Sequence, residues 1–218
     1  MVTPLFPTPD SPGLDLRERR RLETSAAIGD ATLDLFETRG VEHTTVADIA
    51  AAAGISVRTF FRYFPSKEAA AVDGQPVFGP VMRDLLTSLT PEKPLLPQIE
   101  GAFHAVLVEL EQYGGAVHRQ LIRVRTLMLE NGSLRAASLR YEDENDRALA
   151  AEIAARYPLP GGASEAWIAV HLATFTLRTA FDSWVQQVDD SDRETLADTH
   201  TRLVDARNAL VAGSANAR

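Results

Sequence analysis

The chain has 218 residues, of which 24% are charged and 45% hydrophobic, with no cysteine and a formal net charge of −8 at pH 7. This length suits one or two globular domains, and the absence of cysteine excludes disulfides, zinc–thiolate sites, iron–sulfur clusters and a cysteine nucleophile. No run is apolar enough for a membrane span and the first fifteen residues lack the features of a secretory signal, so we expect a cytoplasmic protein. The negative charge argues against a nucleic-acid partner unless positive charge is concentrated locally.

Proline marks the first boundary in the chain. Four of the 12 prolines fall within the first twelve residues, so we expect residues 1–16 to form a flexible tail. The rest of the sequence is rich in Ala, Leu, Arg and Glu, which are good helix formers, and it contains no extended β-branched alternation. We therefore predict an all-α fold of about nine or ten helices.

The first predicted helix covers residues 17–39, where apolar or small side chains recur at spacings of three and four, and it ends at Gly40. The second covers 46–52 and follows Thr45, which forms a capping-box pattern with Asp48.

Ser56 is a good N-cap for a third helix, which Pro65 closes, and Ser66 caps a fourth. Gly, Pro, Asn or Ser-Asp signals bound the later helices. We expect these near residues 77–89, 95–113, 116–130, 133–156, 164–187 and 192–212.

The second and third helices are joined by a tight turn that contains Gly54, which is helix-turn-helix geometry. The later helix of such a pair can enter the major groove of DNA. Phe60 and Phe64 are four residues apart and are expected to face the core. A solvated helix face usually mixes acids with bases, whereas residues 55–67 contain no acid, which favours a phosphate partner. The bases in this stretch are Arg58, Arg62 and Lys67.

Three linked motifs then resemble the DNA-binding segment of TetR-family transcriptional regulators. They are Ile28-x-x-Ala31-x-x-x-Leu35-Phe36-x-x-x-Gly40, Thr44-Thr45-Val46-x-x-Ile49-Ala50-x-x-Ala53-Gly54-Ile55-Ser56 and Thr59-Phe60-Phe61-x-Tyr63-Phe64-Pro65-Ser66-Lys67-Glu68. The resemblance implies a helix-turn-helix DNA-binding domain over residues 17–67. It also implies a helical effector-binding and dimerisation domain over residues 68–218, with double-stranded operator DNA and a second copy of the chain as partners.

The resemblance places the recognition helix at residues 56–64. Val57 and Arg58 are then expected to face bases, with Arg58 able to make a bidentate contact to guanine. The resemblance implies that Phe61 is a DNA contact along the phosphates, at a position where family members often have Tyr, so a hydroxyl donor to phosphate is absent. The other expected DNA contacts on and near this helix are Thr45, Ser56, Thr59, Arg62, Tyr63 and Lys67.

A basic run precedes the first long helix and includes Arg17, Arg20 and Arg21. Basic residues at a helix N-terminus oppose the helix dipole, so their presence favours an arm that reaches phosphate or the minor groove. A simple solvated helix start is the alternative.

Residues 68–218 show no catalytic pattern: there is no Gly-rich phosphate loop, no Ser-centred elbow and no HExxH motif. We therefore predict no enzyme activity and no cofactor. Glu100 and His104 are four residues apart and could share a metal, but a lone pair of this kind is more often a surface interaction, so no metal site is predicted.

The resemblance implies that the C-terminal half binds a small effector. The segment from Leu121 to Ala136 loosely resembles a branch of the family with an acyl-CoA-like ligand domain, which implies an amphipathic or acyl-type effector. Apolar side chains at helical spacing are also typical of core. The candidate effector residues are Phe103, Leu107, Leu110, Ile122, Arg123, Met128, Tyr141, Trp167 and His171.

The last two predicted helices carry more large apolar area than one helix face in a monomer needs, and the resemblance implies that they pair with the partner chain. The candidate dimer residues are Phe175, Phe181, Trp184, Leu196, Leu203 and Leu210.

The sequence thus predicts a ligand-responsive repressor that a small effector releases from a palindromic operator. The alternatives are a DNA-binding dimer without a sensor, an activator, and a small helical enzyme or carrier that has the motif by chance.

Overall fold

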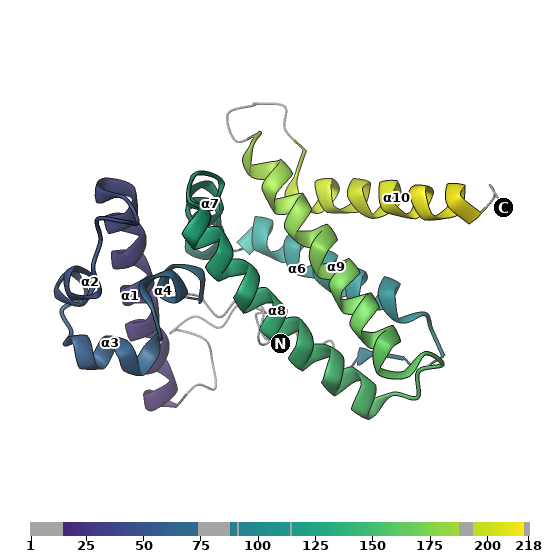
Figure 1. Cartoon of the computed structure of the whole chain (residues 1–218), viewed down its shortest axis with the longest axis horizontal. Helices are drawn as coiled ribbons and strands as arrows, with labels where there is room; N and C mark the ends of the chain where they lie inside the picture. Colours follow the sequence, from purple (N-terminus) through teal and green to yellow (C-terminus); the bar gives the residue numbers. More distant parts are fainter. Residues whose placement is uncertain (1–14, 74–87, 91, 114, 188–193, 216–218) are drawn as a thin grey trace. The chain divides into compact units, whose positions relative to one another are not determined.

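The computed structural model describes residues 15–73, 88–90, 92–113, 115–187 and 194–215, and these residues form helices and short connections without strands (Figure 1). Contacts divide the chain into two compact units. Unit 1 contains residues 1–81 and 116–143, and unit 2 contains residues 82–115 and 144–218.

Unit 1 begins with α1 (Leu16–Arg39), which a reciprocal capping box starts: the Glu18 amide donates to Asp15 Oδ1 at 2.8 Å, and the Asp15 amide donates to Glu18 Oε2 at 3.2 Å. The helix therefore starts within the segment that the sequence analysis assigned to the tail. It ends at Gly40, whose φ of 84° is a conformation that residues with a side chain rarely adopt.

The next helices of unit 1 are α2 (Val46–Ala52), α3 (Val57–Tyr63) and α4 (Lys67–Asp73). The predicted capping box of α2 is confirmed, and the hydrogen bonds from Thr45 hold the pKa of Asp48 below its usual value. The Thr59 amide donates to Ser56 Oγ at 3.0 Å, which confirms Ser56 as the N-cap of α3. The turn between α2 and α3 passes through Gly54, with a φ of 67°.

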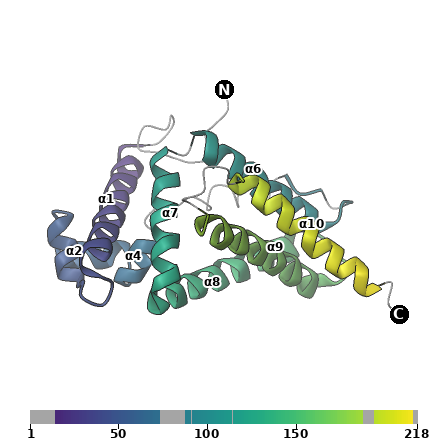
Figure 2. The same cartoon turned by 90° about the horizontal axis from the view of Figure 1, so that it is seen from above.

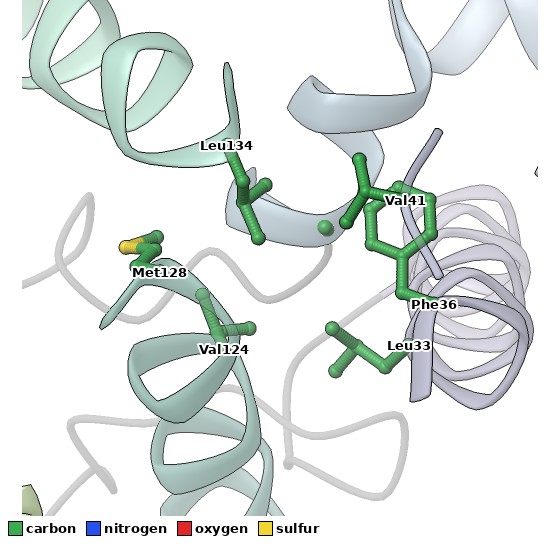
Figure 3. Packing of buried hydrophobic residues seen from close by; sticks show 7 residues of the cluster. Leu33, Phe36, Val41, Val124, Met128 and Leu134 are labelled. Carbon is green, nitrogen blue, oxygen red and sulfur yellow. The ribbon is translucent and has the colours of Figure 1, made fainter. Parts of the chain in front are cut away.

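Helix α7 (Gly115–Glu130) and the first part of α8 (Gly132–Arg156) complete unit 1. Figure 3 shows the cluster that they form with α1 and α4, in which the labelled side chains of α1, α7, α8 and the loop after α1 point toward one another. Burial of this kind contributes about 1.5–3 kcal/mol for each large side chain. The cluster consists of Leu33, Phe36, Val41, Ala71, Val124, Met128 and Leu134.

A second cluster in unit 1 joins α1 to the helix-turn-helix and α4. Phe60 and Phe64 are 0% and 3% exposed, which confirms that they face the core. The cluster consists of Ile28, Ile49, Ala50, Phe60, Phe64 and Ala70.

Unit 2 is built from α6 (Leu95–Tyr113), the remainder of α8, α9 (Gly162–Val185) and α10 (Leu196–Ala215). Helices α6, α9 and α10 pack against one another, as Figures 1 and 2 both show. Trp184 Nε1 donates to the Glu194 carbonyl at 3.1 Å, which joins α9 to the residues just before α10. The Leu196 amide donates to the Glu111 carboxylate, which joins the start of α10 to α6.

The predicted helices agree with the observed ones to within a few residues wherever the structure describes the chain. Most of the predicted tail and nearly all of the predicted helix at 77–89 lie outside the described residues. None of the described helices is both long enough and apolar enough to cross a membrane. The predicted domain boundary at residue 67 stays a prediction, and the structure adds that residues 116–143 group with the N-terminal helices.

Candidate nucleic-acid interface

Helix α3 has one buried side and one exposed side. Phe60 anchors the buried side, while Arg58 and Arg62 stand on the exposed side, one helical turn apart. Val57 and Phe61 are also exposed, at 42% and 55%. The exposed side thus combines two guanidinium groups with two apolar side chains and carries no acid.

The polar side chains around α3 are partly engaged within the protein. Ser56 Oγ lies 2.9 Å from Thr59 Oγ1, so these two hydroxyls are oriented by each other and by the helix start. The Arg62 guanidinium lies 5.4 Å from the centre of the Tyr63 ring, a cation–π contact that aligns both groups along the helix. Such a preorganised array can present donors to phosphate oxygens at little entropic cost.

Lys67 occupies a more constrained position than the sequence suggested. Its Nζ donates to the Val41 carbonyl at 2.6 Å and to the Thr44 carbonyl at 3.0 Å. An ammonium group has three N–H donors, so two hold α4 to the loop between α1 and α2 and one remains. The charge is therefore fixed beside the exposed N-cap residue Thr45 of α2.

Arg17, Arg20 and Arg21 are all exposed in the first turns of α1, where Thr24 donates to the Arg20 carbonyl at 2.8 Å. None of the three arginines forms an ion pair with another residue in the part of the chain that the structure describes. Their positive charge is thus available to an external anion.

The candidate effector residues are divided between the two units. Ile122, Arg123, Met128 and Tyr141 lie in unit 1, where Met128 belongs to the cluster of Figure 3. The other five lie in unit 2, and they are Phe103, Leu107, Leu110, Trp167 and His171. That all nine line one pocket stays a prediction.

Within this set, Arg123 has acidic partners that the sequence analysis did not identify: it pairs with Glu37 and Asp34 of α1. In unit 2, the Trp167 and His171 rings lie 3.7 Å apart between centroids. Asp146 accepts from Thr174 Oγ1 at 2.9 Å and lies 3.8 Å from His171 Nε2, so α8 and α9 are joined by a polar contact here. No sequence signal links Arg123 or His171 to these carboxylates, because the carboxylates lie on other helices.

The candidate dimer residues also divide into two groups. Phe181, Trp184 and Leu196 are at most 2% exposed within the protomer, which makes them core residues of unit 2 and leaves almost no area for a partner. Phe175 and Leu210 are 55% and 74% exposed, and Leu203 is half-buried.

The residues that the sequence analysis considered for a metal have protein partners instead. Glu100 is paired with Arg207, and His104 Nδ1 lies 3.3 Å from Thr201 Oγ1. The described residues contain no group of three or more side chains suited to hold a metal ion.

A helix-turn-helix whose second helix presents an acid-free basic side defines a DNA-binding class of protein. The family of bacterial regulatory proteins named tetR matches residues 28–69. The HTH-type transcriptional regulator TcmR of Streptomyces glaucescens is 38% identical over 154 residues, which cover 68% of this chain and 66% of TcmR. MftR of Mycobacterium tuberculosis is 49% identical over 51 residues, which cover 23% of this chain and 26% of MftR.

The matched segment is therefore just under two thirds of the length of TcmR and about a quarter of that of MftR. The fold is similar to that of Thermus thermophilus FadR, a TetR-family transcriptional repressor solved in complex with lauroyl-CoA. The TM-score is 0.50 at 19% identity, with 83% of this chain and 91% of FadR covered. The chain belongs to the TetR family, whose members are DNA-binding transcriptional regulators.

Proposed function

We propose that the chain is a homodimeric repressor that binds a palindromic operator through α3 and leaves it when a small acyl-type effector binds. The observation that carries the DNA-binding part is the exposed, acid-free side of α3 with Arg58 and Arg62, which stands on a buried Phe60 anchor. The protein acts in this account as a regulator in the cytoplasm and catalyses no reaction.

The proposal of a homodimer rests on apolar area that remains exposed on α9 and α10. Ile168 and Phe175 of α9 are 57% and 55% exposed and lie two turns apart. Leu210 and Val211 of α10 are 74% and 67% exposed. Apolar faces of this size mark an interaction surface, and a palindromic operator requires two copies of α3 about one DNA turn apart or somewhat wider.

The proposal of an acyl-type effector rests on two likenesses. The segment from Leu121 to Ala136 resembles the branch with an acyl-CoA-like ligand domain, and the fold is similar to that of FadR, which was solved with lauroyl-CoA. A ligand can shift the operator equilibrium only if it binds the free and DNA-bound arrangements with different affinity.

Selection of binding sites from random duplexes by the purified full chain tests the DNA-binding part. A palindromic consensus is expected, together with an affinity that falls as salt rises, with a slope set by the number of phosphates that the Lys and Arg side chains contact. Arg58→Ala should relax the consensus, while Arg140→Ala, an exposed arginine on α8, should leave it unchanged. Enrichment of no sequence would contradict the proposal.

The effector and dimer parts have their own measurements. Lauroyl-CoA and shorter acyl-CoAs are titrated into the protein–operator complex, and release of DNA by at least one of them is expected; release by none would contradict an acyl-CoA effector. Light scattering should give a dimer for the wild-type chain and a monomer for Phe175→Asp, with Leu139→Asp on α8 as the control. A monomeric wild type would contradict the dimer.

A further inference from the structure

Helix α3 exposes two large apolar side chains on the side that the proposed function turns toward DNA. Val57 and Phe61 are four residues apart, so they lie one above the other on the helix surface. A single exposed apolar side chain needs no explanation. Two in one row of a seven-residue helix, 42% and 55% exposed, form a small apolar stripe.

The buried aromatic side chains of the helix-turn-helix support the apolar stripe. The Phe61 ring meets the Phe60 ring edge-on, with centroids 5.5 Å apart and an interplanar angle of 88°. Phe60 is completely buried and also lies against Phe64, with ring centroids 6.1 Å apart. Phe61 is thus held on the hydrophobic core by its inner edge while its outer surface faces solvent.

The neighbouring row of α3 carries the charge. Arg58 and Arg62 follow Val57 and Phe61 by one residue each, so a basic row runs beside the apolar row. Residues 55–67 contain no acid. A basic row beside an apolar row is complementary to a surface that carries hydrogen-bond acceptors next to apolar groups.

The base edges in the major groove have that composition. Guanine presents two acceptors that arginine binds bidentately, and the C5-methyl group of thymine is the apolar group on these edges. A phenyl ring has no donor for a phosphate oxygen, which weighs against the expectation that Phe61 lies along the phosphates. Tyr63 and Arg62 supply donors for that role.

We infer that Val57 and Phe61 read thymine methyl groups in the operator, beside a guanine that Arg58 reads. This inference rests on the proposed function, since it needs α3 in the major groove. The apolar row then contributes to the sequence preference of the protein rather than to its contacts with the DNA phosphates. Each half-site is expected to contain a thymine close to the guanine that Arg58 contacts.

Replacement of thymine by uracil removes only the C5-methyl group and leaves the pairing intact. Each dT of a selected operator is changed to dU, one position at a time, and the affinity of the full chain is measured. At the contacted positions we expect affinity to fall about fourfold, the value of one buried methyl-sized group. Other positions should change little.

Protein variants assign the effect to the two side chains. In Val57→Ala and Phe61→Ala, the loss caused by dU at the matching position should shrink toward no change, while Phe61→Leu should keep most of it. Leu139→Ala, which removes an exposed apolar side chain of α8, serves as the matched control and should show the wild-type loss.

The outcomes separate the inference from the function on which it rests. Sequence-specific binding that is insensitive to dU at every position would overturn the inference and leave the DNA-binding function in place. A dU effect that persists unchanged in both alanine variants would also overturn it. Absence of sequence-specific binding would overturn the proposed function itself. The wild-type dU series can overturn the inference by itself even if an alanine variant fails to fold.

Discussion

Arg123 on α7 and Glu37 on α1 form a bidentate ion pair. Arg123 Nε donates to Glu37 Oε1 and Arg123 Nη2 donates to Glu37 Oε2, each at 2.7 Å. The same Nη2 also donates to Asp34 Oδ1 at 2.5 Å. These carboxylates raise the pKa of Arg123, while burial raises the pKa of the neighbouring Asp30. Because α1 also packs on the helix-turn-helix, the pair connects α7 to the helix that supports the recognition helix.

Arg123→Ala should therefore lower the free energy of unfolding by about 1 kcal/mol, since the pair is bidentate but partly exposed. Thermal and denaturant unfolding measure this change, and Glu37→Gln should add little to it in the double variant. Arg156→Ala breaks an exposed pair with Glu152 within one helix and should change stability less. Independent, additive losses from Arg123→Ala and Glu37→Gln would show that the two residues do not act together.

Lys67→Ala removes two bonds to backbone carbonyls as well as a positive charge. Bonds from charged donors contribute about 1.5–3 kcal/mol each, so the loss of two such bonds at the half-buried Lys67 should lower stability by about 3 kcal/mol, the lower end of their sum. We also expect weaker binding to all duplexes, with a salt slope that is smaller by about one. Lys93→Ala, in an exposed loop of unit 2, should change neither quantity. An unchanged salt slope would assign Lys67 to structure alone.

Arg58→Ala should cost about 1–3 kcal/mol of discrimination at one base pair, because a bidentate contact to guanine is lost. Competition between the operator and a variant changed at that guanine measures this difference. Arg62→Ala should instead weaken both duplexes alike, since phosphate contacts carry no sequence information. Equal weakening of both duplexes by Arg58→Ala would contradict its role at a base.

We expect His200 to make the stability of the chain depend on pH. The ring is 1% exposed, neither ring nitrogen has a hydrogen-bond partner among the described residues, and burial together with His104 and Arg207 lowers its pKa to about 4. The unfolded chain therefore binds the proton more readily. Stability should be complete above about pH 6.5 and fall as the pH drops toward 4, by at most about 3 kcal/mol.

Unfolding by denaturant across pH 4–7 tests this prediction. His200→Leu should flatten the slope, because the group that gains the proton on unfolding is absent, while His43→Gln at an exposed site should keep it. A variant at His200 with the wild-type slope would show that other groups cause the pH dependence.

Local signals predicted the helices well where capping residues and glycine specify the ends. Thr45, Ser56 and Gly40 each take the role expected from the sequence. The proline-rich composition places Asp15 in the predicted tail, whereas in the structure it caps α1 together with Glu18. A single capping pair is weak evidence for the start of a helix when the residues just before it are rich in proline.

The partners of side chains could not be predicted in the same way. Periodicity shows which face of a helix is apolar, but not which helix covers that face. Trp184 was expected at a dimer surface and is instead buried in unit 2, 2% exposed. Arg123 stays a candidate effector residue, and the sequence did not show that it pairs with Glu37, 86 positions earlier. Contacts over such distances depend on the packing of whole helices.

The central claim is that α3 reads a specific DNA sequence through its exposed basic side. Its most direct test is the ratio of affinities of the full chain for the selected operator and for a scrambled duplex of equal length, at one physiological salt concentration. We predict a preference of about a thousandfold or more, which Arg58→Ala should reduce, whereas Arg62→Ala and Arg140→Ala should leave the ratio intact. Equal affinity of the wild-type chain for the two duplexes would contradict the account.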